Sequence, residues 1–216
     1  MSSNTLITNV NKHIQQNFWL YIISILCVFT GIILGIYSVK YMGDYERNDL
    51  LNYLVNFTDP SNTGGISYKL IFTQSVKNNL PVIIFLWFLG LTIVGLPIIL
   101  IIDVLKGFTV GFTFSFMISG LSKNAIGVAL LGVLPQNLIY IPCIIFASVV
   151  SMEFSIMLVK NKFSKQWTSS VSSKILYYSV IFIFITILLF IGIIVESYIS
   201  PYFVKKLINS IGSLAQ

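Results

Sequence analysis

The feature that most constrains this sequence is a series of long segments without a charged side chain. Four of them are each at least 21 residues long, at 14–39, 78–102, 124–152 and 175–195. About 20 apolar residues are enough to carry a helix across a hydrocarbon core of about 30 Å. Backbone groups inside a bilayer must bond to one another, which favours helices. The segments therefore predict an all-α, polytopic integral membrane protein.

A fifth apolar run is shorter, because only 16 residues, Gly107 to Ser122, separate Lys106 from Lys123. At 1.5 Å per residue it spans about 24 Å of helix, less than the thickness of the core. It predicts either a short span with lysines that extend to the surface or a segment that enters and returns. We expect a single membrane domain, 1–216, with about five transmembrane helices at 18–39, 81–102, 107–122, 125–152 and 175–195.

The composition excludes a water-soluble globule, because 56% of the residues are hydrophobic, 9% are charged and the mean hydropathy is +0.90. So few polar side chains cannot cover the surface of a soluble fold of 216 residues. The net charge of +6 fits attraction to anionic lipid. Arginine occurs once, at Arg47, and no basic cluster of the kind that binds nucleic acid is present.

Three segments outside the spans have polar or amphipathic patterns. Residues 1–17 carry apolar side chains three to four positions apart, which predicts an interfacial helix that leads into a retained first span. Residues 40–80 predict an extracytoplasmic segment of two amphipathic helices, either lying on the bilayer or forming a docking platform for another protein. Residues 200–216 predict an amphipathic tail helix at the membrane surface.

Small residues recur at helical spacing in two of the spans. The first span contains Gly31 and Gly35 in a GxxxG motif, and the third has a small residue at every fourth position: Gly107, Gly111, Ser115 and Ser119. Such spacing places a smooth stripe on one face of a helix and allows a second helix to approach closely. Phe108, Phe112 and Phe116 follow one position behind as an aromatic ridge. The pattern predicts close helix packing without identifying the partner helix.

Prolines and amides interrupt the second and fourth spans. Pro97 is expected to kink the second span, and Pro135 and Pro142 are expected to break the fourth, because proline removes a backbone donor. Gln136 and Asn137 lie between the latter two. Two amides in hydrocarbon need partners within the protein. They either compensate the break made by the prolines or form a site for an ion or substrate.

Asp103 and Lys106 follow the second charge-free run at positions i and i+3, close enough to pair on a helix. The interpretation that we favour is an ordinary interfacial ion pair that ends the second span. The alternative is a buried, functional ion pair at membrane depth.

No metal, cofactor or catalytic site is predicted. Cys27 and Cys143 lie in apolar runs and are expected to be small buried side chains rather than a disulfide or a metal pair. The sequence has one histidine and contains no GxSxG, HExxH or glycine-rich phosphate loop. We therefore expect a protein that is not an enzyme.

The distribution of lysine suggests an orientation in the membrane. Counting all basic residues does not separate the two sides, but short loops carry the most weight in the positive-inside rule. The densest basic loop holds Lys160, Lys162, Lys165 and Lys174. With five crossings this loop is on the same side as the N-terminus, which predicts a cytoplasmic N-terminus and an extracytoplasmic C-terminus.

Three stretches together resemble the stage II sporulation protein M family of endospore-forming bacteria. They are Asn78-Asn79-Leu80-Pro81, GLPIILIIDVLKGFTVGFTFSF at 95–116 and LLGVLPQNLIYIPCIIFAS at 130–148. The resemblance covers nearly the whole chain, and LPQN and GFTVGF are its specific parts. It implies a multi-pass protein of the mother-cell membrane at the sporulation septum. It also implies a complex with a membrane-anchored peptidoglycan lytic transglycosylase and an amidase, in which the protein acts as scaffold during septal thinning and forespore engulfment.

Two functions follow from these observations. The first is a non-enzymatic scaffold that contacts the two hydrolases, and membrane lipid, through the 40–80 segment and the small-residue face of the third span. A second copy of the chain is a further partner for such a face. The alternative is a transporter or channel for an ion or small solute, because Gly90 and Gly95 lie five residues apart ahead of Leu96-Pro97, as Gly127 and Gly132 do ahead of Leu134-Pro135. Paired broken helices of this kind form midplane sites in secondary transporters.

Overall fold

The computed structural model describes residues 13–50, 68–120, 125–163 and 171–202, and every regular element in these ranges is helical. The helices are α2 (Phe18–Lys40), α5 (Tyr68–Gly90), α6 (Gly95–Gly120), α7 (Ala125–Phe163) and α8 (Val171–Ile194), which continues into the π-helical η1 (Val195–Ile199). Most of the predicted interfacial helix 1–17, residues 51–67 of the predicted 40–80 segment and most of the tail 200–216 lie outside the described residues.

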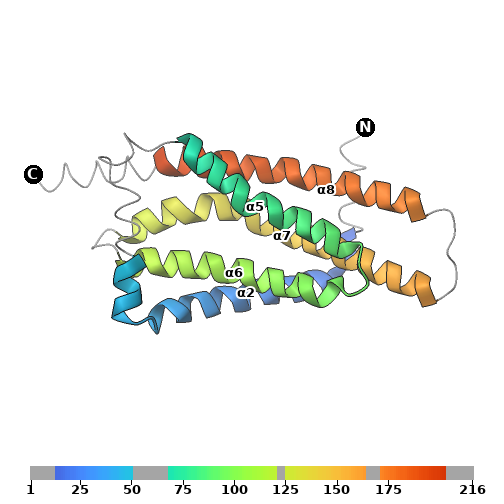
Figure 1. The fold of residues 1–216 in the computed structure, drawn as a ribbon, viewed down its shortest axis with the longest axis horizontal. Coiled ribbons are helices and arrows are strands. Elements are labelled where there is room, and N and C mark those ends of the chain that lie inside the picture. The colour runs from blue at the N-terminus through green and yellow to red at the C-terminus, as the bar shows by residue number, and fades with distance from the viewer. Residues whose placement is uncertain (1–12, 51–67, 121–124, 164–170, 203–216) are drawn as a thin grey trace, which may run out of the picture.

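The long helices lie side by side as a bundle (Figure 1). In Figure 1 each long helix, from α2 to α8, runs in the direction opposite to the long helix before it in the chain. Helices α2 and α6 therefore run the same way. The start of α2 and the end of η1 lie at opposite ends of the bundle. Helix α7 contacts α2, α5, α6, α8 and η1, and it is the most buried of the apolar helices. The bundle is therefore built around α7.

The closest helix pair is α2 with α6, and glycines make this contact. A Cβ atom added to Gly31, Gly35, Gly107 or Gly111 would first meet a backbone carbonyl oxygen of the opposite helix, that of Val104, Phe108, Val28 or Ile32 respectively. In each case this carbonyl belongs to the residue three positions before the opposing glycine. The glycine Cα–H groups thus face carbonyl oxygens, the weak hydrogen bonds that recur where helices touch. The predicted packing role of these glycines agrees with the structure, and their partner is another helix of the same chain.

Among the residues that the structure describes, four helices are long and apolar enough to cross a membrane: Phe18–Lys40, Gly95–Ser119, Gly132–Asn161 and Ser173–Tyr202. The predicted spans at 18–39, 125–152 and 175–195 correspond to three of them. The predicted spans at 81–102 and 107–122 are wrong in their boundaries. Residues 95–120 form one helix, and the chain reverses at 91–94 instead of at Asp103 and Lys106.

Helix α5 packs within the bundle, but it is not one of the four apolar spans. Its second half is the apolar start of the predicted second span, and its first half contains Lys69 and Lys77. The second amphipathic helix expected in 40–80 is thus the first half of α5. The buried side chains in that half are both polar, namely Ser75 and Asn79.

The turn at 91–94 has identifiable local causes. The Thr92 hydroxyl donates to the Leu89 carbonyl oxygen over 2.7 Å, and this carbonyl also accepts from the Thr92 backbone N–H over 2.9 Å. Gly95 lies so close to Leu89 that an added Cβ would be 2.8 Å from the Leu89 carbonyl carbon. Pro97 lies in the first turn of α6, where a missing N–H leaves no helical hydrogen bond unmade. The expected kink at Pro97 is therefore a helix start.

Pro135 and Pro142 both lie inside the continuous helix α7. The predicted break of the fourth span is not found, because residues 125–163 are helical throughout. Proline is tolerated inside membrane helices when neighbouring helices pack around the altered backbone. The contacts of α7 with four other helices supply that packing.

Candidate functional site

Asp103 joins three helices at the middle of the bundle. Its side chain is fully buried on α6. Ser24 of α2 donates to Asp103 Oδ2 and Ser148 of α7 donates to Asp103 Oδ1, each over 2.6 Å. Hydrogen bonds to a carboxylate are stronger than those between neutral groups. This cluster therefore fixes the register of α2, α6 and α7 relative to one another.

Lys106 lies one turn further along α6 and makes a different contact. Its Nζ donates to Asn79 Oδ1 of α5 over 3.2 Å, while the Asn79 amide nitrogen donates to the Ser75 carbonyl oxygen over 3.1 Å. Asp103 and Lys106 therefore have separate partners and both lie within α6. The expected interfacial ion pair that ends a span is wrong, because the bundle provides hydroxyl and amide partners for both groups.

The two amides of α7 bond to the backbone of their own helix. Gln136 Nε2 donates to the Gly132 carbonyl oxygen over 2.5 Å and Asn137 Nδ2 to that of Val133 over 2.7 Å. The amides thus find partners inside the protein, as predicted. These carbonyls are not the ones that Pro135 and Pro142 leave without a helical donor, which belong to the residues four positions before each proline.

The π-helical turn η1 brings an acidic and a hydroxyl side chain onto α7. Tyr140 donates its hydroxyl hydrogen to Glu196 Oε2 over 2.6 Å. Ser200, just after η1, donates to Gln136 Oε1 over 2.8 Å. A π-turn changes the direction of the side chains that follow it and is often found at functional sites. No pattern in the sequence predicted this turn, because Glu196 is only the residue that follows the last charge-free run.

These groups surround a polar cavity of about 310 Å³ between α5, α6, α7 and η1. Its lining combines one ammonium, one carboxylate, amides and hydroxyls, from Asn78, Asn79, Lys106, Thr109, Thr113, Gln136, Asn137, Tyr140 and Glu196. Lys106 is 14 residues from the end of α6 at Gly120, or roughly 21 Å of helix. The cavity therefore reaches from one end of the bundle to about its middle.

The small-residue ladder of α6 divides into two parts. Gly107 and Gly111 are buried against α2. Ser115 and Ser119 continue the ladder, and the Ser119 hydroxyl donates to the Ser115 carbonyl oxygen. Phe108, Phe112 and Phe116 stack in sequence with ring centroids 5.9 and 6.0 Å apart, which confirms the aromatic ridge. The part of the smooth face that Gly107 and Gly111 form is thus occupied by α2 and is not free for another protein.

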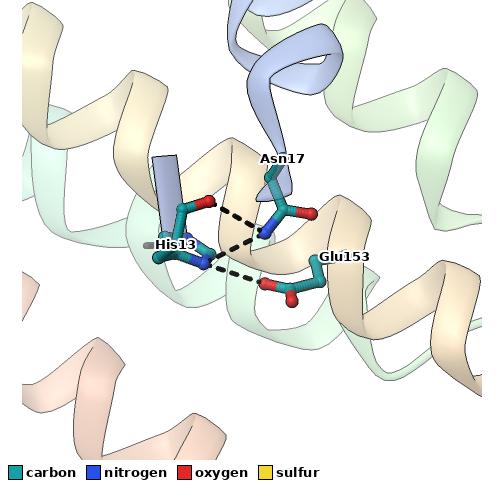
Figure 2. Close-up of polar contacts among 3 residues, drawn as sticks. All are labelled: His13, Asn17 and Glu153. Atoms are coloured by element: carbon teal, nitrogen blue, oxygen red, sulfur yellow. Dashed lines mark hydrogen bonds and ion pairs between the residues drawn. The ribbon is translucent and has the colours of Figure 1, made fainter. Parts of the chain in front are cut away.

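Figure 2 shows a second polar cluster, where His13 and Asn17, just before α2, meet Glu153 of α7. His13 Nδ1 lies 3.3 Å from Glu153 Oε2 of α7, and Asn17 Nδ2 lies 3.0 Å from the same imidazole nitrogen. Asn17 also bonds to the His13 carbonyl oxygen. The sequence did not predict this contact, because Glu153 is 140 residues from His13 and appeared only as the end of a charge-free run.

The remaining candidate groups are the two cysteines and the side chains that could bind a metal ion. Cys27 and Cys143 are both free, and Cys143 is buried. Within the described ranges no three histidine, cysteine, aspartate or glutamate side chains gather as a metal ion would require.

Comparison with known proteins gives one match. The family model described as stage II sporulation protein M matches residues 24–201, a range that includes all of α5, α6, α7, α8 and η1. Searches of curated proteins and of solved structures give no match.

Proposed function

The chain belongs to the stage II sporulation protein M family, and from this we propose that it is a non-enzymatic membrane scaffold for cell-wall hydrolases. The family and the four apolar helices make it a sporulation-related membrane protein. Its proposed partners are a membrane-anchored peptidoglycan lytic transglycosylase and an amidase. The proposed role is to hold them at the septum of the mother cell during septal thinning and engulfment. The family match over residues 24–201 is the observation that carries this proposal.

The internal contacts support a structural role for the polar side chains. Asp103 accepts from two serines, and Ser151 and Ser155 of α7 donate to the carbonyl oxygens of Leu86 and Thr92. Each of these bonds links α7 or α6 to another part of the bundle. Groups with such fixed partners stabilise a rigid frame, which is what a scaffold requires to hold partners at defined positions.

The docking surface that we propose is a stripe of exposed tyrosines at the end of α2. Tyr37, Tyr41 and Tyr45 are four residues apart, and the last two are 76% and 80% exposed. Tyr37 and Tyr41 stack with centroids 6.1 Å apart. Arg47 donates to the Ser119 carbonyl oxygen, which holds the chain after the stripe against the end of α6. Exposed tyrosines are common both in membrane interface belts and in protein contacts.

The proposed orientation places this stripe outside the cytoplasm, where the hydrolases act. Lys106 no longer counts as a loop residue, because it lies within α6. Lys160 and Lys174 lie near the adjoining ends of α7 and α8, at the end of the bundle where α2 begins (Figure 1). The positive-inside rule then places the start of α2 in the cytoplasm.

The test is recovery of the two hydrolases with a tagged chain from membranes of sporulating cells. Replacing Tyr41 and Tyr45 by alanine should lower recovery of both. Tyr177→Ala is the matched control, since Tyr177 is 70% exposed and lies near the start of α8, at the other end of the bundle. If the double variant and the control recover equal amounts of the hydrolases, at equal protein levels, the stripe is not part of the interface. If wild-type chain recovers neither hydrolase after mild crosslinking, the scaffold role itself fails.

The helices do not support the transporter interpretation. It required two broken helices, at Pro97 and Pro135, in corresponding positions. Pro97 instead lies in the first turn of α6, and Pro135 lies inside a continuous helix.

A further inference from the structure

The polar cavity adjoins an apolar groove on the side of the bundle. The groove has a volume of about 740 Å³ and lies between α2, α6 and α7. Cavity and groove share four lining residues, namely Val110, Val133, Asn137 and Ile141. The two spaces are therefore neighbours, and a molecule that fills both would have a polar part between the helices and an apolar part along the outside. This combination is the shape of an amphiphile.

The polar part contains two opposite charges that each keep free capacity. Lys106 Nζ has three donors, and Asn79 Oδ1 is its partner in the described ranges; no carboxylate there is within ion-pairing distance of it. Among the hydrogen bonds of the described residues, Glu196 accepts one, at Oε2 from the Tyr140 hydroxyl. Charged groups at membrane depth are costly unless they are paired. A ligand with an anion for Lys106 and a cation for Glu196 would satisfy both.

The apolar part is open to the surroundings of the bundle. It is lined almost entirely by carbon, with Ile32 and Ile36 on one side and Leu134 and Leu138 on the other. Leu138 is 79% exposed. In a bilayer such a groove is filled by hydrocarbon, and an acyl chain fits its length along α7.

We infer that this site holds one glycerophospholipid whose headgroup carries a phosphate and a primary ammonium, as phosphatidylethanolamine does. Lys106 binds the phosphate, Glu196 binds the ammonium and the groove holds an acyl chain. The cavity has the volume of about ten water molecules at ~30 Å³ each, enough for this headgroup with some water. A headgroup without an ammonium leaves Glu196 unpaired. A quaternary choline lacks the N–H donors that Glu196 can bind.

The test is lipid retention by the purified full-length chain in detergent, measured by native mass spectrometry. Phosphatidylethanolamine, phosphatidylglycerol and phosphatidylcholine are supplied with identical acyl chains, and free phosphoethanolamine is supplied separately. The expected result is about tenfold stronger binding of phosphatidylethanolamine than of each of the other three. Phosphatidylglycerol and phosphatidylcholine keep the phosphate but lack N–H donors for a charge-assisted hydrogen bond to Glu196, and free phosphoethanolamine lacks the acyl chain that the groove holds. Equal retention of the three lipids overturns the inference. Free phosphoethanolamine that binds as strongly as the lipid also overturns it.

Variants assign the two charges. Lys106→Gln should lower phosphatidylethanolamine binding about tenfold, and Lys106→Arg should restore it, because a guanidinium also binds phosphate. Lys69→Gln is the control, since Lys69 is exposed on α5. Glu196→Gln should remove the preference over phosphatidylglycerol while lipid binding persists. If Lys106→Gln does not fold, Glu196→Gln decides alone, and an unchanged preference in that variant overturns the assignment.

Discussion

Replacing the glycines between α2 and α6 by alanine should destabilise the bundle. An added Cβ at Gly35 would lie 2.6 Å from the Phe112 backbone nitrogen, and one at Gly111 would lie 2.8 Å from Ile32 Cα. Favourable contacts between heavy atoms require about 3.5–4.0 Å. The nearest atoms are backbone, which cannot rotate away as a side chain can. The two helices must therefore move apart by about 0.5–1 Å, which forfeits about a quarter to a half of the dispersion energy between facing atoms.

The expected size of the effect combines two opposing contributions. Overpacking of a close contact costs about 1–3 kcal/mol. Alanine is favoured over glycine within a helix by up to about 1 kcal/mol, which offsets part of this cost. Because the added Cβ atoms meet backbone, the upper part of that range applies, about 2–3 kcal/mol. Subtracting about 1 kcal/mol leaves a net loss of about 1–2 kcal/mol at each glycine, a factor of about 5–30 in the ratio of folded to unfolded protein. When Gly35 and Gly111 are replaced together, the losses should be less than additive, because one separation of the helices accommodates both methyl groups.

The assay is reversible unfolding in mixed micelles with increasing SDS, followed by tryptophan fluorescence. Gly43→Ala is the matched control, since nothing lies within 4 Å of a Cβ added at Gly43. Gly31→Ala and Gly107→Ala extend the series along the same contact. Losses at these four glycines no larger than that at Gly43 would refute close packing of α2 against α6. Strict additivity in the Gly35 and Gly111 pair would refute the shared separation.

Three further predictions concern other parts of the bundle. Ser148→Ala removes one of two hydroxyl donors to the buried carboxylate and should lower the free energy of unfolding by about 1–2 kcal/mol, whereas Ser173→Ala, at an exposed serine, should not change it. The orientation can be tested in a chain whose native cysteines are replaced by serine. Tyr45→Cys should then react with a membrane-impermeant maleimide in intact cells, and Lys174→Cys should not. The opposite pattern would reverse the proposed orientation. Glu153→Gln should change stability by less than about 1 kcal/mol, because this carboxylate is half exposed, and a larger loss would show that its contact with the imidazole is more important than its exposure suggests.

The sequence predicted the class of fold and the packing glycines, because both depend on local patterns. Charge-free runs predicted the first span at 18–39, where the structure has Phe18–Lys40, and the last at 175–195, which lies within the longer Ser173–Tyr202. The period of four in Gly107 and Gly111 predicted a smooth face that the structure confirms. Which helix covers this face depends on the arrangement of the whole bundle, so the sequence did not predict it. The structure shows that α2 packs against this part of α6.

The sequence failed where charged residues are buried. Asp103 and Lys106 were interpreted as the end of a span, because isolated charges at membrane depth are costly. Ser24 and Ser148 lower this cost, and they are 79 and 45 residues away from Asp103 in sequence. No local pattern connects them. The true turn at 91–94 had weaker signals, namely the flanking Gly90 and Gly95 and a proline in the next helical turn.

The polar groups of this bundle differ in how many hydrogen-bond partners they have. This difference distinguishes groups with a structural role from groups that can bind a ligand. Asp103 is fully buried, has a donor on each carboxylate oxygen and does not line the polar cavity, so a ligand in the cavity does not reach it. Lys106, one turn away on the same helix, has a single hydrogen-bond partner among the described residues and lines the cavity. A buried charge that is satisfied by the chain fixes helices, while a charge that is only partly satisfied requires a further group. In a bilayer, where water is scarce and lipid is abundant, a lipid headgroup is the group most available to fill that position.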